Sequence, residues 1–449
     1  MNVVTTEGFV AKRDRFGVRP FYYASIDGGV VWSESLEEVV AHPGVDALQL
    51  DDDAVADYLA NGVSLDAEAT VYANIRRLPP AHELHLRNGE PLAQRYWSLP
   101  APARSSDAPK KLEAALRDSI RDCLTAPSAV VFMSGGLDST TLAALAREVA
   151  PEVELLAATS VYRSRIPDVE EAYAVEAARS IGIPIRLFPL DGFHALQALE
   201  ERVWTADPGA LISAPASRHI HAEAAKHAPV AMQGHPADAL LHVALTPYLR
   251  GLGFFERIAA LVRFTLFQRR PPYFFVRDLI GWPPRHRVRS PLPDWLRVQP
   301  RSQQETPPLA SAAWANYYEW AHPSFTKAAI DVVYPWLDER VVEAALAMPP
   351  IPWLVDKEVL RRLLRGRISE TVRTRKKTYM QADPWSISLP VARSLEIEAA
   401  SRWIDPARFS RAVRLAPVLS NTTLRAVALE YWLRELPSRI PSVRGSNRA

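Results

Sequence analysis

The chain has 449 residues, of which 48% are apolar and 23% charged, a balance that excludes a wholly disordered protein. Lys and Arg number 53 against 51 Asp and Glu, and a net charge of +2 is too small for a dedicated nucleic-acid binder. The single cysteine, Cys123, cannot form an internal disulfide or a paired-cysteine zinc site. No apolar run is long enough for a membrane helix, and the first residues lack a signal-peptide pattern. We therefore expect a cytoplasmic protein without membrane or nucleic-acid partners.

The first hundred residues differ from the rest in charge and pattern. They hold 8 basic and 15 acidic side chains, whereas the remainder holds 45 basic and 36 acidic. Short runs of β-forming residues and one helical run predict an α+β segment. These runs lie at 21–24, 30–32 and 82–86, with the helix at 54–61. Residues 101–110 belong to a stretch rich in Pro, Ala and Ser, which indicates a linker between domains at 1–100 and 111–449.

After the linker, strands and helices alternate. Strands are predicted at 129–133, 154–158 and 184–187, and helices at 111–124, 140–149 and 170–181. This alternation predicts an α/β fold with a parallel sheet and right-handed crossovers, followed by a mostly helical part at 311–435. Cys123 falls on the apolar face of the first helix, where we expect it to pack rather than react.

Residues 250–301 have an unusual composition, with eleven Arg, no Lys and three acidic residues among Phe, Tyr and Trp. One interpretation is a solvated helical insertion whose arginines lie along its surface. The other is a docking face for an acidic or extended partner, because Arg and aromatic residues are favoured at interfaces.

The most informative stretch is the loop at 134–140, which reads Ser-Gly-Gly-Leu-Asp-Ser-Thr between a strand and a helix. Two glycines allow a tight turn whose N–H groups face an anion, and the following helix adds its positive end. The hydroxyls of Ser134, Ser139 and Thr140 can donate to phosphate oxygens. Asp138 would repel bare phosphate, so it indicates a bound Mg²⁺. No Lys follows the glycines, so this is not a Walker A loop.

This loop resembles the pyrophosphate loop of the ATP pyrophosphatases, and the chain as a whole resembles the asparagine synthetase family. The resemblance rests on the order and spacing of several short motifs. They are the run Arg13 to Tyr23, Ser33-Glu34, residues 78–82, Tyr96-Trp97, residues 234–238, residues 334–338, Lys357 to Arg361, and Arg375 to Lys377. The N-terminal motifs are similar to the family's class-II glutaminase domain, an Ntn-type α+β sandwich.

The resemblance implies that a carboxylate is adenylated by ATP and then transferred to an amine. ATP and its pyrophosphate would be held by the residues of this loop, by two residues at the end of the next strand, and by the glycine of the loop at 234–238. These are Ser134, Gly135, Gly136, Leu137, Asp138, Ser139, Thr140, Thr159, Ser160 and Gly234. Asp138 and Asp238 would hold Mg²⁺. Lys357 and Lys377 would face the phosphates, with Lys377 the better match to the catalytic lysine, although Lys376 beside it makes the assignment ambiguous by one residue.

Two departures from the family pattern change the expected chemistry. The family's glutaminase uses an N-terminal Cys nucleophile, but Asn2 stands here, so glutamine hydrolysis is not expected. Part of the glutaminase sandwich is also missing, which indicates a truncated scaffold or a misplaced gene start. In the loop at 234–239, His235 and Ala239 stand where asparagine synthetases carry Glu. The absence of these two Glu residues argues against ammonia as the nucleophile. His235 either accepts a proton from an amine or only shapes the loop.

The family branch without the glutaminase cysteine includes β-lactam synthetases and lasso-peptide macrolactam synthetases. We expect the second activity, an ATP- and Mg²⁺-dependent closure of a precursor peptide, possible partners being a leader-binding protein and a protease. Alternatives are an asparagine synthetase that uses free ammonia, a β-lactam-type ligase, and a binding scaffold that retains the nucleotide loop without turnover.

Overall fold

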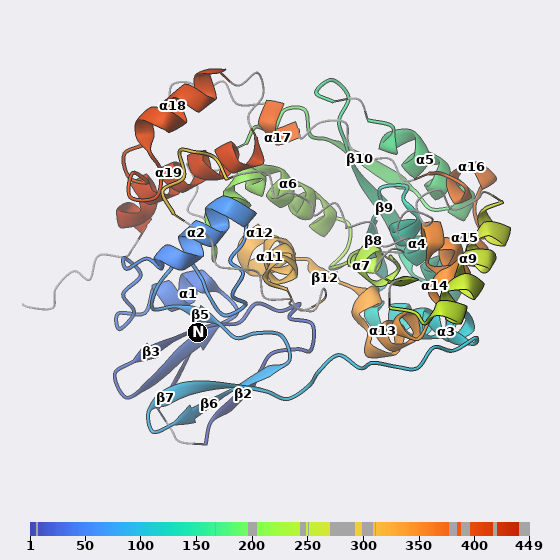
Figure 1. Ribbon diagram of the computed structural model, residues 1–449, viewed down its shortest axis with the longest axis horizontal. Helices are drawn as coiled ribbons and strands as arrows, with labels where there is room; N and C mark the ends of the chain where they lie inside the picture. Colours follow the sequence, from blue (N-terminus) through green and yellow to red (C-terminus); the bar gives the residue numbers. More distant parts are fainter. Residues whose placement is uncertain are drawn as a thin grey trace, which may run out of the picture.

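The computed structural model describes most of the chain and places its three sheets and surrounding helices (Figure 1). The described residues are 1–5, 8–166, 168–195, 204–242, 248–249, 251–269, 292–298, 309, 311–376, 384–387, 396–415 and 420–439. Two small antiparallel sheets lie at the lower left of Figure 1, and a parallel sheet lies to the right. The α/β fold predicted from the sequence is therefore confirmed.

The N-terminal part contains two antiparallel sheets and two helices. One sheet has the order β1-β4-β3-β5 and the other β2-β6-β7. The elements are β1 (Asn2–Val4), β2 (Val10–Lys12), β3 (Tyr22–Ile26), β4 (Gly29–Ser33), α1 (Leu36–Val40), α2 (Asp52–Asn61), β5 (Arg76–Arg77), β6 (His82–Arg87) and β7 (Glu90–Arg95). The turn between β6 and β7 places Asn88 and Gly89 at φ 52° and 76°, as a two-residue hairpin requires.

The central sheet has five parallel strands in the order β10-β9-β8-β11-β12. The chain passes outward from β8 through β9 to β10 and then returns to β11 on the other side of β8. The order of winding therefore reverses between β8 and β11, which is where α/β sheets bind ligands. In Figure 1, α4 and α5 lie to the right of this sheet and α6 to the left, as right-handed crossovers require.

The second part of the chain supplies the remaining elements. Around the sheet these are α3 (Ala108–Cys123), β8 (Ser128–Phe132), α4 (Leu137–Val149), β9 (Glu154–Val161), α5 (Glu170–Ile181), β10 (Ile185–Pro189), η2 (Pro208–Ile212), α6 (Ala214–Ala225), β11 (Val230–Gln233), α7 (Ala237–Leu240) and α9 (Phe254–Gln268). The C-terminal ones are α11 (Ala312–Ala321), α12 (Pro323–Thr326), β12 (Asp331–Val333), η4 (Pro335–Leu337), α13 (Glu339–Leu346), α14 (Pro350–Trp353), η5 (Val355–Lys357), α15 (Glu358–Leu363), α16 (Glu370–Arg373), α17 (Pro384–Ile387), α18 (Pro406–Leu415) and α19 (Asn421–Arg439).

The N- and C-terminal helices share a hydrophobic core. Tyr58 of α2 and Trp432 of α19 are both fully buried in the same cluster. The Tyr58 hydroxyl donates to the Arg425 carbonyl at 3.2 Å, and the Arg425 guanidinium donates to the Ala60 carbonyl at 2.9 Å. Helix α2 of the first hundred residues is thus held against α19.

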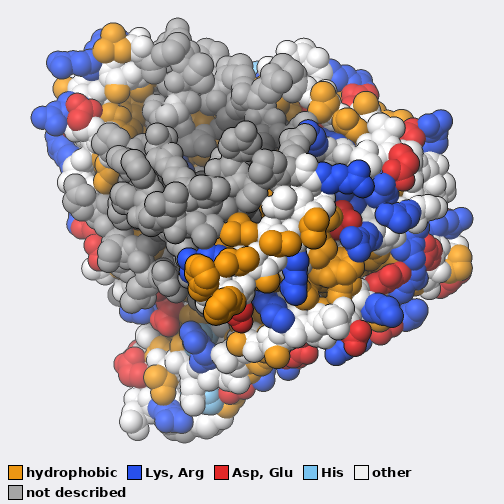
Figure 2. Space-filling view, turned by 45° about the vertical axis from the view of Figure 1, so that its right-hand side comes forward, with side chains coloured by type: hydrophobic (Ala, Val, Ile, Leu, Met, Phe, Trp, Pro, Cys, Tyr) orange, Lys and Arg blue, Asp and Glu red, His pale blue; other side chains and the backbone are white. Residues whose placement is uncertain are grey.

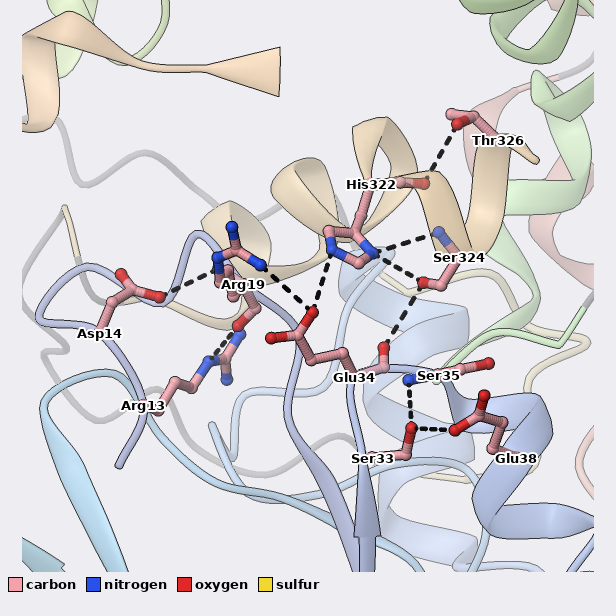
Figure 3. A network of polar contacts seen from close by, with 10 residues as sticks. All are labelled: Arg13, Asp14, Arg19, Ser33, Glu34, Ser35, Glu38, His322, Ser324 and Thr326. Atoms are coloured by element: carbon pink, nitrogen blue, oxygen red, sulfur yellow. Dashed lines mark hydrogen bonds and ion pairs between the residues drawn. The ribbon is translucent and has the colours of Figure 1, made fainter. Parts of the chain in front are cut away.

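A polar network joins the N-terminal sheet to the α11–α12 corner (Figure 3). Glu34, which follows β4, approaches His322 Nε2 at 3.5 Å and Arg19 Nη1 at 3.5 Å. The Ser324 hydroxyl donates to the Glu34 carbonyl at 3.4 Å. The hydrogen bond from His322, reinforced by Arg19, lowers the pKa of the Glu34 carboxyl against the opposing effect of its partial burial. Beneath this network, the buried Arg13 guanidinium donates to three backbone carbonyls.

The stretch at 250–301 is described only at 251–269 and 292–298. Its helix α9 places Ala260 against Ile351 and Val355, whereas Phe255 and Leu266 are 83% and 74% exposed. Figure 2 turns forward the side of the molecule that carries α9, and apolar side chains gather there. The described surface of this helix is therefore largely apolar. The two interpretations of the arginines at 250–301, a solvated insertion or a docking face, stay predictions.

Cys123 ends α3, where burial raises the pKa of its thiol to about 11. A thiol with that pKa is almost entirely protonated at neutral pH, which agrees with the predicted packing role. Among the described helices, none combines the length and apolar character needed to cross a membrane.

Candidate active site

The loop between β8 and α4 has the tight backbone that its glycines predict. Gly135 has φ 68°, and a side chain there would bring its Cβ within 2.5 Å of the Ala174 nitrogen on α5. Only glycine fits both conditions. The Ser134 hydroxyl accepts from the Gly136 N–H at 3.4 Å, and the Ser134 N–H donates to the Ser139 hydroxyl at 3.3 Å. Local hydrogen bonds therefore shape the loop directly before the start of α4.

The loop after β11 meets the first loop at the reversal point of the sheet. Gly234 lies so close to α4 that a Cβ there would be 2.9 Å from the Ser139 nitrogen. Asp238 follows on α7, and Asp138 lies in the first turn of α4. Two carboxylates from separate loops thus approach the same space at the C-terminal edge of the parallel sheet.

Lys357 joins these two carboxylates. Its Nζ donates to Asp138 Oδ1 at 2.6 Å and forms an ion pair with Asp238. The Lys357 side chain is only 15% exposed. Its backbone and that of Asp356 lie in the left-handed region, at φ 55° and 49°, directly before α15. This bend directs the lysine back to the sheet.

The two aspartates suit a magnesium ion. Among the residues that the structure describes, no three His, Cys, Asp or Glu side chains gather into a complete metal site. Mg²⁺ seldom needs one, because it commonly binds one or two carboxylates and takes its other ligands from water and substrate phosphates. Asp138 and Asp238 already face one cation, the Lys357 ammonium, so their oxygens are placed for a divalent ion nearby.

A cavity of about 420 Å³ opens over these groups. Its wall includes most of the residues that the sequence singles out. They are Ser134, Gly136, Asp138, Ser139, Ser160, Gly234, His235 and Asp238. Residues of α6 form a further wall that the sequence did not indicate: Ala216, Ser217, Ile220 and His221, with Ser213 directly before the helix. Glu170 also lines the cavity, where burial and the nearby Asp168 raise the pKa of its carboxyl.

Comparison with known proteins agrees with this geometry. The asparagine synthase family profile matches residues 111–435, and the glutamine amidotransferase domain profile matches residues 4–97. This chain belongs to the asparagine synthase family.

Three curated relatives of this asparagine synthase family member give the range of similarity. Asparagine synthetase [glutamine-hydrolyzing] 3 of Bacillus subtilis is 26% identical over 30% of the chain, and synthetase 1 of the same organism is 25% identical over 51%. A putative asparagine synthetase of Mycobacterium bovis is 32% identical over 53%. The matched regions span 23%, 36% and 38% of those relatives.

Several predicted ligand residues of this family member lie behind the cavity wall. Thr140 is fully buried, and among the described residues its hydroxyl has no hydrogen-bond partner. Thr140 is not among the residues that line the cavity, and its role as a phosphate donor stays a prediction. The Thr159 hydroxyl donates to the Met133 carbonyl and supports the loop from below. Leu137 is half-buried against the core of the sheet. Lys377 lies outside the described residues.

Two arginines within the family's motifs, Arg361 and Arg375, also lie at the site, although no role was predicted for them from the sequence. Arg375 Nη1 lies 3.4 Å from the Ser134 carbonyl, and its guanidinium lies 4.2 Å from the centre of the Tyr173 ring. Arg361 donates to the Asp356 carbonyl at 2.9 Å and to the Arg375 carbonyl at 2.8 Å. Arg361 thus ties the segment before Lys357 to the segment that carries Arg375. The signal in the sequence that could have identified these two arginines is their place in the motifs at 357–361 and 375–377.

His235 is held by an aromatic partner. Its Nδ1 lies 2.7 Å from the Tyr317 hydroxyl, which also accepts from the Gln233 amide. Burial raises the pKa of Tyr317 far above the ordinary range, so the phenol stays neutral. The His235 imidazole therefore has a neutral hydrogen-bonding neighbour in Tyr317.

Proposed function

We propose that this protein is an ATP-dependent amide ligase that works through an acyl-adenylate. In the first step a carboxylate oxygen of the substrate attacks the α-phosphorus of ATP, and pyrophosphate leaves. In the second step an amine nitrogen attacks the activated acyl carbon, AMP leaves with its electron pair, and the amine gives up a proton. The observation that carries the proposal is the convergence of Asp138, Asp238 and Lys357 over the glycine loop at the reversal point of the sheet.

The chain's own groups can perform the first step. The N–H groups of the loop at 134–136 and the start of α4 would bind the leaving pyrophosphate. Lys357 would move from the aspartates to the phosphates when nucleotide binds, because a phosphate carries more charge than a carboxylate. Mg²⁺ held by Asp138 and Asp238 would neutralise charge on the leaving group. Arg375 would hold the Ser134 end of the loop.

Pyrophosphate–ATP exchange tests this first step. Wild-type protein should exchange labelled pyrophosphate into ATP when a suitable carboxylate is present. Asp138→Ala should abolish the exchange, and Asp238→Asn should raise the Mg²⁺ concentration needed for half-maximal rate. Asp118→Ala, an exposed carboxylate paired with Arg121 on α3, is the matched control. Formation of ADP instead of AMP would contradict adenylation.

We further propose that the amine belongs to a peptide and that the product is a lasso-peptide macrolactam. His235 and Ala239 replace two acids of the asparagine synthetase pattern, which disfavours free ammonia. The His235 imidazole lines the cavity beside Tyr317, and an imidazole is a suitable acceptor for the proton of an attacking amine. Holding the N-terminal amine and the Asp or Glu side chain of one peptide together in the cavity would raise their effective concentration greatly.

Mass spectrometry distinguishes the candidate products. A precursor peptide with an Asp or Glu side chain at the ring position should lose one water in the presence of ATP and this protein, together with any leader-binding partner. Asparagine formed from aspartate and ammonium would instead support the synthetase alternative. Turnover of neither substrate, with exchange intact, would point to a different small-molecule ligase such as a β-lactam synthetase.

A further inference from the structure

His221 is a buried imidazole on the cavity wall that neither step uses. It lies on α6, is 8% exposed, and its ring centre is 5.2 Å from that of Phe132 at the end of β8. The apolar neighbour and the depth of burial lower the pKa of His221, so the ring is neutral at physiological pH.

The hydrogen bonding of His221 identifies its tautomer. Nδ1 lies 2.7 Å from the Ser217 carbonyl oxygen, which can only accept. The neutral ring must therefore carry its proton on Nδ1, and Nε2 keeps its lone pair. Among the described residues, that nitrogen has no hydrogen-bond partner. A buried acceptor without a donor is costly, so a donor from a bound molecule would stabilise it.

The neighbours of His221 place it between the His235 side of the cavity and the end of β9. Phe132, which the imidazole contacts, is paired across the sheet with Gln233 of β11 on one side and Ala158 of β9 on the other. Gln233 is bonded to the Tyr317 hydroxyl that contacts His235. Gln233 and Ala158 both line the same cavity as His221.

We propose that His221 determines specificity by accepting, at Nε2, a hydrogen bond from an N–H group of a molecule bound in the cavity. Two sources offer this chemistry, namely the exocyclic amine of adenine and an N–H of the carboxylate substrate. The inference deepens the proposed function and rests on the same cavity. Because the Nδ1 proton is already committed to Ser217, a ligand that presents only acceptors here would be rejected.

The nucleotide arm of the test needs no acyl substrate. Calorimetry would compare Mg²⁺–ATP with purine riboside 5′-triphosphate, which lacks the exocyclic amine, for wild type, His221→Phe and His221→Gln. If adenine is the donor, His221→Phe should weaken ATP binding by about 3- to 10-fold, leave the analogue unchanged, and be partly rescued by His221→Gln. His219→Phe, the same change at an exposed position of α6, is the control.

The carboxylate arm uses pyrophosphate exchange with the substrate that wild type accepts. One outcome is that His221→Phe keeps the wild-type preference for ATP over the analogue and shows a KM for the carboxylate that is raised several-fold. That result assigns the N–H donor to the acyl substrate. Equal weakening of both nucleotides, or no change in either arm, overturns the inference. If no carboxylate supports pyrophosphate exchange by the wild-type protein, the proposed function fails. The nucleotide arm then decides alone, and an unchanged preference for ATP overturns the role of His221 as well.

Discussion

Lys357 Nζ donates to Asp138 Oδ1 at 2.6 Å although the two residues are 219 positions apart in the chain. The same ammonium pairs with Asp238, so one cation holds together the loops that follow β8 and β11. Such an arrangement keeps two carboxylates close before any nucleotide binds. It also places a positive charge where the pyrophosphate is expected to leave.

Lys357→Met should therefore reduce pyrophosphate exchange by about 100-fold, because it removes a positive donor that would stabilise charge on the departing pyrophosphate. Lys357→Arg should retain part of the rate. Lys327→Met, which removes a surface cation paired with Glu37, should leave the rate unchanged. A Lys357→Met protein with nearly wild-type exchange would exclude the lysine from charge stabilisation.

Gly135→Ala tests the shape of the loop. The substitution imposes both the left-handed backbone at φ 68° and a 2.5 Å approach to the Ala174 nitrogen. Gly182→Ala is the matched control, because it has φ 76° but open space around the new methyl group. Gly182→Ala should cost about 1 kcal/mol of unfolding free energy, and Gly135→Ala more. Chemical denaturation and nucleotide binding would measure the two effects. Equal stability and equal nucleotide affinity of the variants would mean that the loop tolerates a side chain.

Arg361 is expected to position the site without touching substrate. Arg361→Ala should release the segments that carry Lys357 and Arg375, because their carbonyls lose a shared donor. We expect a KM for ATP raised by about 10-fold in steady-state exchange, with little loss of folded protein by circular dichroism. The neighbouring Arg362→Ala should keep the wild-type KM, since Arg362 bonds Glu358 and lies over Trp353 instead. A global loss of stability in Arg361→Ala alone would show a structural role.

Local sequence predicted the features that depend on a few consecutive residues. The strand, glycine turn and helix around 134–140 are set by apolar residues, two glycines and a run of helix formers, and the structure has all three. The helix predicted at 170–181 has those limits, and Gly182 ends it in the left-handed region. The strands β11 and β12 were not predicted, because four- and three-residue strands carry too little periodicity.

Features that depend on tertiary contacts escaped sequence reasoning. Nothing in the order of residues indicates that Trp432 shares a core with Tyr58, or that Arg361 spans two segments of the site. The buried position of Thr140 follows from the direction in which α4 presents its first turn to the sheet. Asp138 was indicated by the glycine loop itself, whereas Asp238 and Lys357 were found only through family motifs, because the point where the three residues meet is created by the sheet topology.

Glu34 provides a test of the contact between the N-terminal sheet and the α11–α12 corner. Its pKa is lowered by the hydrogen bond with His322 and by Arg19, so the folded state favours the charged carboxylate. A group with a depressed folded pKa stabilises the protein above its unfolded pKa, about 4.3 for Glu, and loses that effect as pH falls through the folded pKa. Glu34→Gln should therefore lower Tm at pH 6, and its Tm should converge with that of wild type as the pH falls below about 4. Glu90→Gln, a surface change on β7, should show no such convergence. A Tm difference that stays constant across this range would mean that the lost contact is not ionic.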